Sequence, residues 1–141
     1  MSRRRRATET TGGSDEREAR FLSIPLSRVE LGAETARLRA EQEYADGDRN
    51  GRTLAKVGAF RLVLVAFRAG ARFDEQDQRG SVALQVLEGR VAVRVDAETV
   101  EIGLAEIAVV APGHPWTAVA LADGAMLIQL AWPPEPGSTT S

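Results

Sequence analysis

Residues 82–95 read VALQVLEGRVAVRV, and this stretch decides the fold class. Two short segments rich in Val, Ala and Leu stand on either side of Glu88-Gly89. Glycine tolerates the positive φ of tight turns, so we predict a hairpin turn there between strands at residues 82–87 and 91–95.

The same pattern extends in both directions from Arg52 onward, with Val, Ile and Leu segments broken by turn residues and no helical stretch between them. A second hairpin turn is predicted at Asp123-Gly124. Eight strands are predicted, at residues 53–57, 60–67, 82–87, 91–95, 99–102, 107–110, 117–121 and 125–132. Short strands without intervening helices indicate an all-β barrel or sandwich, not a parallel sheet.

A helix is predicted before the strands. Ser27 and Glu30 fit a capping box, and Gly47 supplies a stop. Four residues follow at nearly helical spacing: Leu31, Thr35, Leu38 and Tyr44. We therefore expect one amphipathic helix from about residue 28 to 45, with Arg37 and Glu41 able to pair.

The strand around Leu64 is apolar on both faces, since residues 62–66 read LVLVA. One face should line the interior, and the other must be covered by the helix or by a second subunit. A homodimer is therefore a natural hypothesis.

The ends of the chain differ from its centre. Residues 1–20 are Arg-rich with almost nothing apolar, and residues 133–141 are Pro-, Ser- and Thr-rich, so both are predicted disordered. Between them we expect one domain, a helical segment at 21–50 and strands at 51–132.

The chain after residue 20 is acidic, which argues against nucleic-acid binding as a function, and the Arg cluster at 3–6 is read as a solubilising tail. No apolar run could span a membrane and no signal-type core follows MSRRRR, so a cytoplasmic protein is expected.

Chemistry is limited by composition, because the chain has no Cys and a single His, His114. Thiolate nucleophiles and Cys-based zinc sites are excluded. His114 is the one candidate catalytic residue, as a general acid or base.

Two motif frames resemble the cupin superfamily. Gly70 and Gly89 stand at the spacing of the first cupin motif, and residues 105–116, AEIAVVAPGHPW, resemble the second. The similarity covers roughly residues 52–132. It implies a single cupin-type double-stranded β-helix, or jelly-roll barrel, preceded by the amphipathic helix.

The metal ligands of that family are replaced here. The resemblance puts Gln76 and Gln78 at the His-x-His positions, Val82 at the glutamate position and Trp116 at the last histidine position. Neutral amides are weak ligands, and Val and indole cannot serve. We expect no metal and no cofactor. Strand alternation sends Asp77 and Glu75 toward solvent if the two glutamines point inward.

A ligand pocket is the remaining expectation, lined by Gln76, Gln78, Val82, Leu84, Trp116 and Gln129. The first hypothesis is a metal-free domain that binds a small polar or aromatic molecule in the barrel. The second is a metal-independent isomerase, epimerase or cyclase that uses His114 with glutamine donors. The third is a structural or interaction protein that forms a homodimer, its Arg-rich arm contacting an acidic partner.

Overall fold

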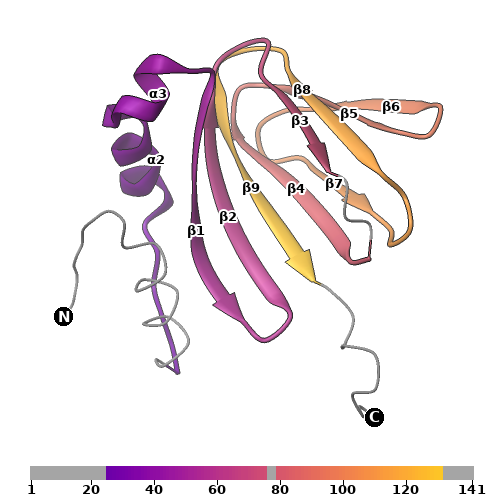
Figure 1. Ribbon diagram of the computed structural model, residues 1–141, viewed down its shortest axis with the longest axis horizontal. Coiled ribbons are helices and arrows are strands. Elements are labelled where there is room, and N and C mark those ends of the chain that lie inside the picture. Colours follow the sequence, from indigo (N-terminus) through magenta and orange to yellow (C-terminus); the bar gives the residue numbers. More distant parts are fainter. Residues whose placement is uncertain (1–24, 76–78, 132–141) are drawn as a thin grey trace.

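Two antiparallel sheets face each other in the computed structural model, which describes residues 25–75 and 79–131 (Figure 1). Two short helices lie against the outside of one sheet. The elements are α2 (Leu31–Ala40), α3 (Gln42–Asp46), β1 (Arg49–Val57), β2 (Phe60–Phe67), β3 (Arg72–Glu75), β4 (Ser81–Glu88), β5 (Val91–Val95), β6 (Glu98–Ile102), β7 (Ile107–Val110), β8 (Trp116–Ala120) and β9 (Gly124–Ala131). The strand orders are β1-β2-β9-β4-β7 and β3-β8-β5-β6.

The chain passes from one sheet to the other at most of its turns. Among the strands that the structure describes, only β1–β2 and β5–β6 are consecutive and pair with each other. Glu88-Gly89 and Asp123-Gly124 are turns, as predicted, and Gly89 has a φ of 85°. They are not hairpins, however, because β4 and β5 lie in different sheets, and so do β8 and β9.

These two crossings pack directly against each other. A Cβ on Gly89 would lie 2.5 Å from the carbonyl oxygen of Asp123, and a Cβ on Gly124 would overlap the carbonyl oxygen of Glu88. A third crossing, from β2 to β3, joins them, since Ala69 N–H donates to Asp123 Oδ1 at 2.8 Å. The sheets are thus fastened together at this end of the molecule.

The main core lies between the sheets. Val82, Leu84 and Val86 point into it from β4, and Phe67 meets Phe73 edge to face with ring centroids 6.0 Å apart. Strands β4 and β8 bury every second side chain, because alternate residues of a strand face opposite sides of its sheet.

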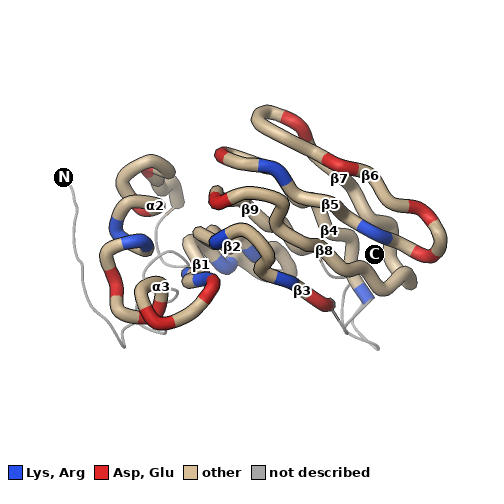
Figure 2. Tube along the Cα trace, turned by 90° about the horizontal axis from the view of Figure 1, so that it is seen from above, with Lys and Arg blue, Asp and Glu red and all other residues tan. Residues whose placement is uncertain are grey.

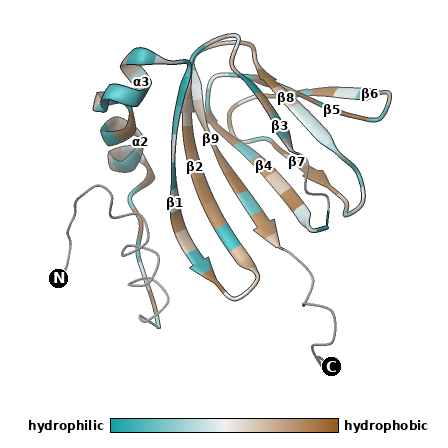
Figure 3. Ribbon diagram, viewed as in Figure 1, coloured by the Kyte–Doolittle hydropathy of each residue, from teal (hydrophilic) through white to brown (hydrophobic). Residues whose placement is uncertain are grey.

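A second apolar cluster lies between the helices and the outer face of the five-stranded sheet. Leu38 of α2 and Tyr44 of α3 pack on Leu64 and Ala66 of β2. The sequence predicts that the second apolar face of the strand around Leu64 is covered by the helix or by a second subunit. In the structure, the helices cover it (Figure 3). This face gives no reason to expect a second subunit on it.

The predicted single helix is wrong in its start and in its continuity. It begins at Leu31 with Glu30 as N-cap, no side chain caps it, and it breaks at Glu41, whose backbone is extended. The break has a physical cause. Asn50 on β1 donates one amide N–H group to Leu38 O and one to Glu41 Oε1, both at 2.9 Å.

Ion pairs reinforce this break, and they differ from the predicted one. Arg37 pairs with Glu34 and not with Glu41. Glu41 instead accepts from Arg52 of β1 at 2.6 Å, and Arg52 also reaches Glu34 at 3.2 Å. Helix α2 carries charges of both signs, and these residues tie it to the sheet (Figure 2).

Strand β3 was not predicted, and β1 begins four residues before its predicted start. Both contain charged residues, which mask the apolar signal. Yet Ala71 and Phe73 are buried while Arg72 and Asp74 are exposed, the alternation of a half-buried strand.

The predicted disordered tails, Asp77 and the two glutamines Gln76 and Gln78 lie outside the described residues. No helix in the described ranges is long and apolar enough to cross a membrane.

The contact between the crossings predicts a large cost for Gly124→Ala. The added methyl overlaps a backbone oxygen that cannot move without parting the sheets, so we expect a loss of at least about 2 kcal/mol in unfolding free energy. Gly32→Ala is the matched control. It meets open space in an exposed helical turn and should stabilise by about 0.5 kcal/mol. Urea unfolding measures both, and equal effects would refute the packing argument.

The helix break predicts that Asn50→Leu destabilises the protein by about 1–3 kcal/mol, because it removes the side-chain donor of Leu38 O and leaves that oxygen only the 3.3 Å bond from Glu41 N–H. The control is Gln42→Ala. This substitution removes an exposed hydrogen bond of the same 2.9 Å length, from the Gln42 side-chain amide to Asp46, and should lower the unfolding free energy by well under about 1 kcal/mol. A similar loss in both variants, measured by thermal unfolding, would show that Asn50 does not fasten the helices.

Candidate functional site

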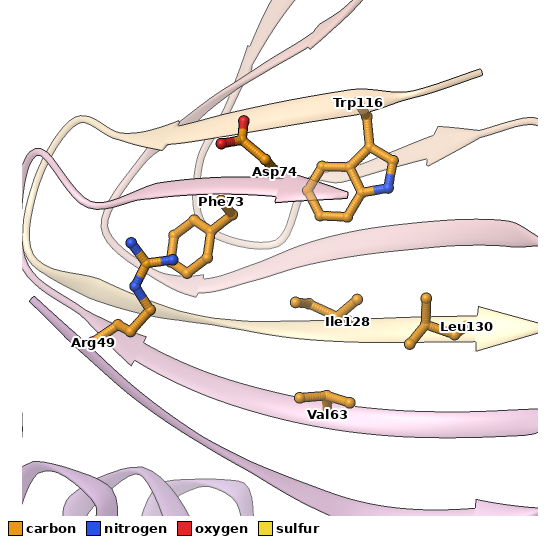
Figure 4. A pocket seen from close by; sticks show the side chains of 7 residues that line it. All are labelled: Arg49, Val63, Phe73, Asp74, Trp116, Ile128 and Leu130. Atoms are coloured by element: carbon orange, nitrogen blue, oxygen red, sulfur yellow. The ribbon is translucent and has the colours of Figure 1, made fainter. Parts of the chain in front are cut away.

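A cavity of about 250 Å³ lies between the two sheets (Figure 4). Strands β2 and β9 form one wall with Val63, Ile128 and Leu130, and β3 and β8 form the other with Phe73, Asp74 and Trp116. Arg49 of β1 closes one end. The lining is mostly apolar, and its two charged residues, Arg49 and Asp74, keep partly exposed side chains, so the cavity reaches the surface beside them.

Trp116 is the largest side chain of the wall and only 5% exposed. It begins β8 and pairs with Val95 on one side and with Glu75 on the other. Its indole N–H is buried and has no hydrogen-bond partner in the part of the chain that the structure describes. A buried donor without an acceptor costs about 1–3 kcal/mol, so an acceptor brought by a ligand would recover stability here.

The charged rim is held by ion pairs. The Arg49 guanidinium lies 4.3 Å from the centre of the Phe73 ring, and its Nε donates to Asp48 at 3.0 Å. That hydrogen bond lowers the pKa of Asp48. Asp74 accepts from Arg72 at 3.2 Å. The rim therefore carries both signs of charge and no strong excess of either.

The structure brings one of the proposed pocket residues to the cavity wall, namely Trp116. Val82 and Leu84 are fully packed in the core and do not line the cavity. Gln129 lies on the opposite face of β9, where it donates to Gln85 at 3.5 Å. Gln76 and Gln78 follow Glu75 in sequence, outside the described residues, so their predicted role stays a prediction.

Six lining residues had not been proposed from the sequence: Arg49, Val63, Phe73, Asp74, Ile128 and Leu130. The alternation in β9 was a usable signal, because Ile128 and Leu130 share the inward face with Met126 while Gln129 does not. Phe73 required strand β3 to be recognised first. Arg49 had no such signal, since an arginine at the start of a strand is more often a surface residue.

His114 lies apart from this cavity. Its Nδ1 is 3.3 Å from Oδ2 of Asp96, in the turn between β5 and β6, and both side chains are about half exposed or more. The sequence had offered no carboxylate partner for His114, and the structure supplies one. The pair does not line the cavity, so a ligand held there would not meet the imidazole.

At the described positions that the resemblance assigns to metal ligands, the residues do not fit a metal. Two of the four positions are described, and both hold buried side chains without a ligating atom, Val82 and Trp116. Within residues 25–75 and 79–131, no three His, Cys, Asp or Glu side chains come together as a metal site would require.

Comparison with known proteins supports the fold. No protein-family model matches the sequence, and no curated protein matches it. Solved structures do. A cupin superfamily protein from Desulfitobacterium hafniense has a TM-score of 0.63 at 14% identity, over 78% of this chain and 95% of its own. A conserved protein of unknown function from Streptococcus pyogenes has 0.61 at 19%, over 79% and 93%. An RmlC-like cupin from Shewanella frigidimarina has 0.56 at 22%, over 65% and 83%. The chain therefore has the fold of the cupin superfamily.

Proposed function

We propose that this domain binds a small, flat, largely apolar molecule between its sheets, with a hydrogen-bond acceptor on the molecule facing Trp116. The observation that carries the proposal is the buried indole N–H without an acceptor, in the wall of an apolar cavity that reaches the surface. Binding sites of this type combine apolar walls with a few polar groups that fix orientation.

The size of the cavity limits the ligand. An apolar cavity of about 150 Å³ is enough for benzene. The 250 Å³ available here suits one substituted ring and is below the usual range for drug-sized molecules. Phe73 and Trp116 provide aromatic surfaces for such a ring, and Ile128 and Leu130 lie on the opposite wall.

The need for a hydrogen-bond acceptor opposite the Trp116 indole N–H also limits the chemical class of the ligand. An indole N–H only donates, so it favours a carboxylate, carbonyl or ether oxygen over a second donor. A carboxylate would also benefit from Arg49, whose guanidinium already stacks on Phe73 at the rim. We infer an aromatic carboxylic acid or a related oxygen-bearing ring as the preferred ligand.

Catalysis by His114 is less well supported. The imidazole has a carboxylate partner in Asp96, but that pair is on the surface outside the cavity. A binding role needs only the groups that line the cavity, whereas an isomerase or cyclase would need a proton-transfer group there as well.

The proposal predicts that benzoate moves the indole N–H resonance of Trp116 in a two-dimensional NMR titration to about 10 mM. The chain has two tryptophans, Trp116 and Trp132, so the spectrum of Trp116→Phe assigns the peak. Toluene has the same ring without an acceptor and should shift this resonance much less. Ile128→Phe fills the cavity and should abolish the benzoate effect while the protein stays folded.

Two outcomes would contradict this site. One is a Trp116 resonance that stays fixed with benzoate throughout the titration. The other is a benzoate shift of the same size in Ile128→Phe, which would place the binding elsewhere on the surface.

A further inference from the structure

Strand β7 is an unusual edge strand. The two sheets, as described, have four edges, formed by β1, β7, β3 and β6. β1 contains Arg and Lys and is irregular near Leu54, β3 contains Arg, Asp and Glu, and β6 contains two Glu. β7 reads IAVV and has no charge, proline or bulge. Edge strands usually carry such features because an open edge can pair with another chain.

The outer face beside β7 is also apolar and exposed. Ile107 is 50% exposed and Val109 is 73% exposed. On the neighbouring β4, their partners on the same face are Gln85 and Ala83, both uncharged. Helices α2 and α3 cover β1 and β2 and also contact parts of β9 and β4, through Leu127 and Leu87, but they leave β7 open (Figure 3).

We propose that β7 pairs antiparallel with β7 of a second copy of this chain, about a twofold axis, so that two five-stranded sheets become one continuous sheet. Side chains that lie opposite each other in an antiparallel pair point to the same face. Two registers near the middle of this four-residue strand respect this, with Ala108 or with Val109 opposite itself in the second copy. We choose Ala108 because that register gives both exposed side chains an apolar partner. Ile107 of each copy then lies opposite Val109 of the other, so each exposed side chain gains an apolar cross-strand neighbour.

A second copy fits this surface better than a foreign peptide because the strand is its own complement. It has no charge that requires an opposite charge on the partner, and a twofold axis presents the same patch from both sides. Strand β7 has four residues, so the interface is small and reversible association is expected.

Sedimentation velocity over a range of about 1 to 200 µM tests the proposal. We expect the wild-type chain to shift from monomer to dimer with concentration. Val109→Lys should stay monomeric, because a charge on an edge strand opposes pairing and the two lysines would be diagonal neighbours of like charge on one face of the joined sheet. The matched control is Val100→Lys on another edge strand, β6, where Val100 is 43% exposed. It should dimerise like wild type. A wild-type monomer at all concentrations, or a Val109→Lys dimer, would overturn the proposal.

A cysteine variant tests the register itself, since the chain has no cysteine of its own. Ala108→Cys should give a disulfide-linked dimer under mild oxidation, because directly opposed positions of an antiparallel pair bring the two Cα atoms about 4.5–5.5 Å apart, a separation that a disulfide spans. Val100→Cys should not. Equal cross-linking at both positions would mean random collision and would contradict the paired strands.

Discussion

The close approach of Gly89 and Gly124 is the contact on which the arrangement of the sheets depends. Each belongs to a crossing between sheets, and a methyl group on either would collide with the backbone of the other crossing. Side chains near this end, such as Phe67 and Met126, are completely buried. Further along the same strands, Val63 and Ile128 are only partly buried, and the cavity begins there. A domain fastened at one end can thus keep space for a ligand at the other without losing its core.

The polar contacts of β1 decide which part of the five-stranded sheet the helices cover. Asn50 and Arg52 hold the carbonyl end of α2 and the carboxylates of Glu34 and Glu41 over β1 and β2. Buried polar groups specify geometry when each has a partner. The consequence is that the helices lie at one edge of the sheet, and the opposite edge at β7 stays open.

Much of the fold could be predicted from the sequence because its strands alternate strongly. The bounds of β2, β5 and β7 match the predicted strands, and the cupin resemblance is confirmed at the level of fold. The errors occur where tertiary contacts override local pattern. Helix α2 ends early because Asn50 takes its carbonyl group, and β3 is hidden by charged residues on its solvent face. The turns at Gly89 and Gly124 look like hairpins locally, since glycine permits both kinds of turn and only pairing distinguishes them.

The site was harder to predict than the fold, because a cavity depends on which side chains fail to fill the interior. Trp116 was identified from its motif position, but Val82 and Leu84 fill their space while the cavity lies beside Ile128 and Leu130. The most direct measurement of the central claim is a crystal structure of the protein grown with benzoate. We predict a ring between Trp116 and Ile128, with a carboxylate oxygen about 3 Å from the indole nitrogen. A structure in which side chains fill the interior, and the Trp116 indole nitrogen donates a hydrogen bond to a group of the protein itself, would contradict the proposed binding site.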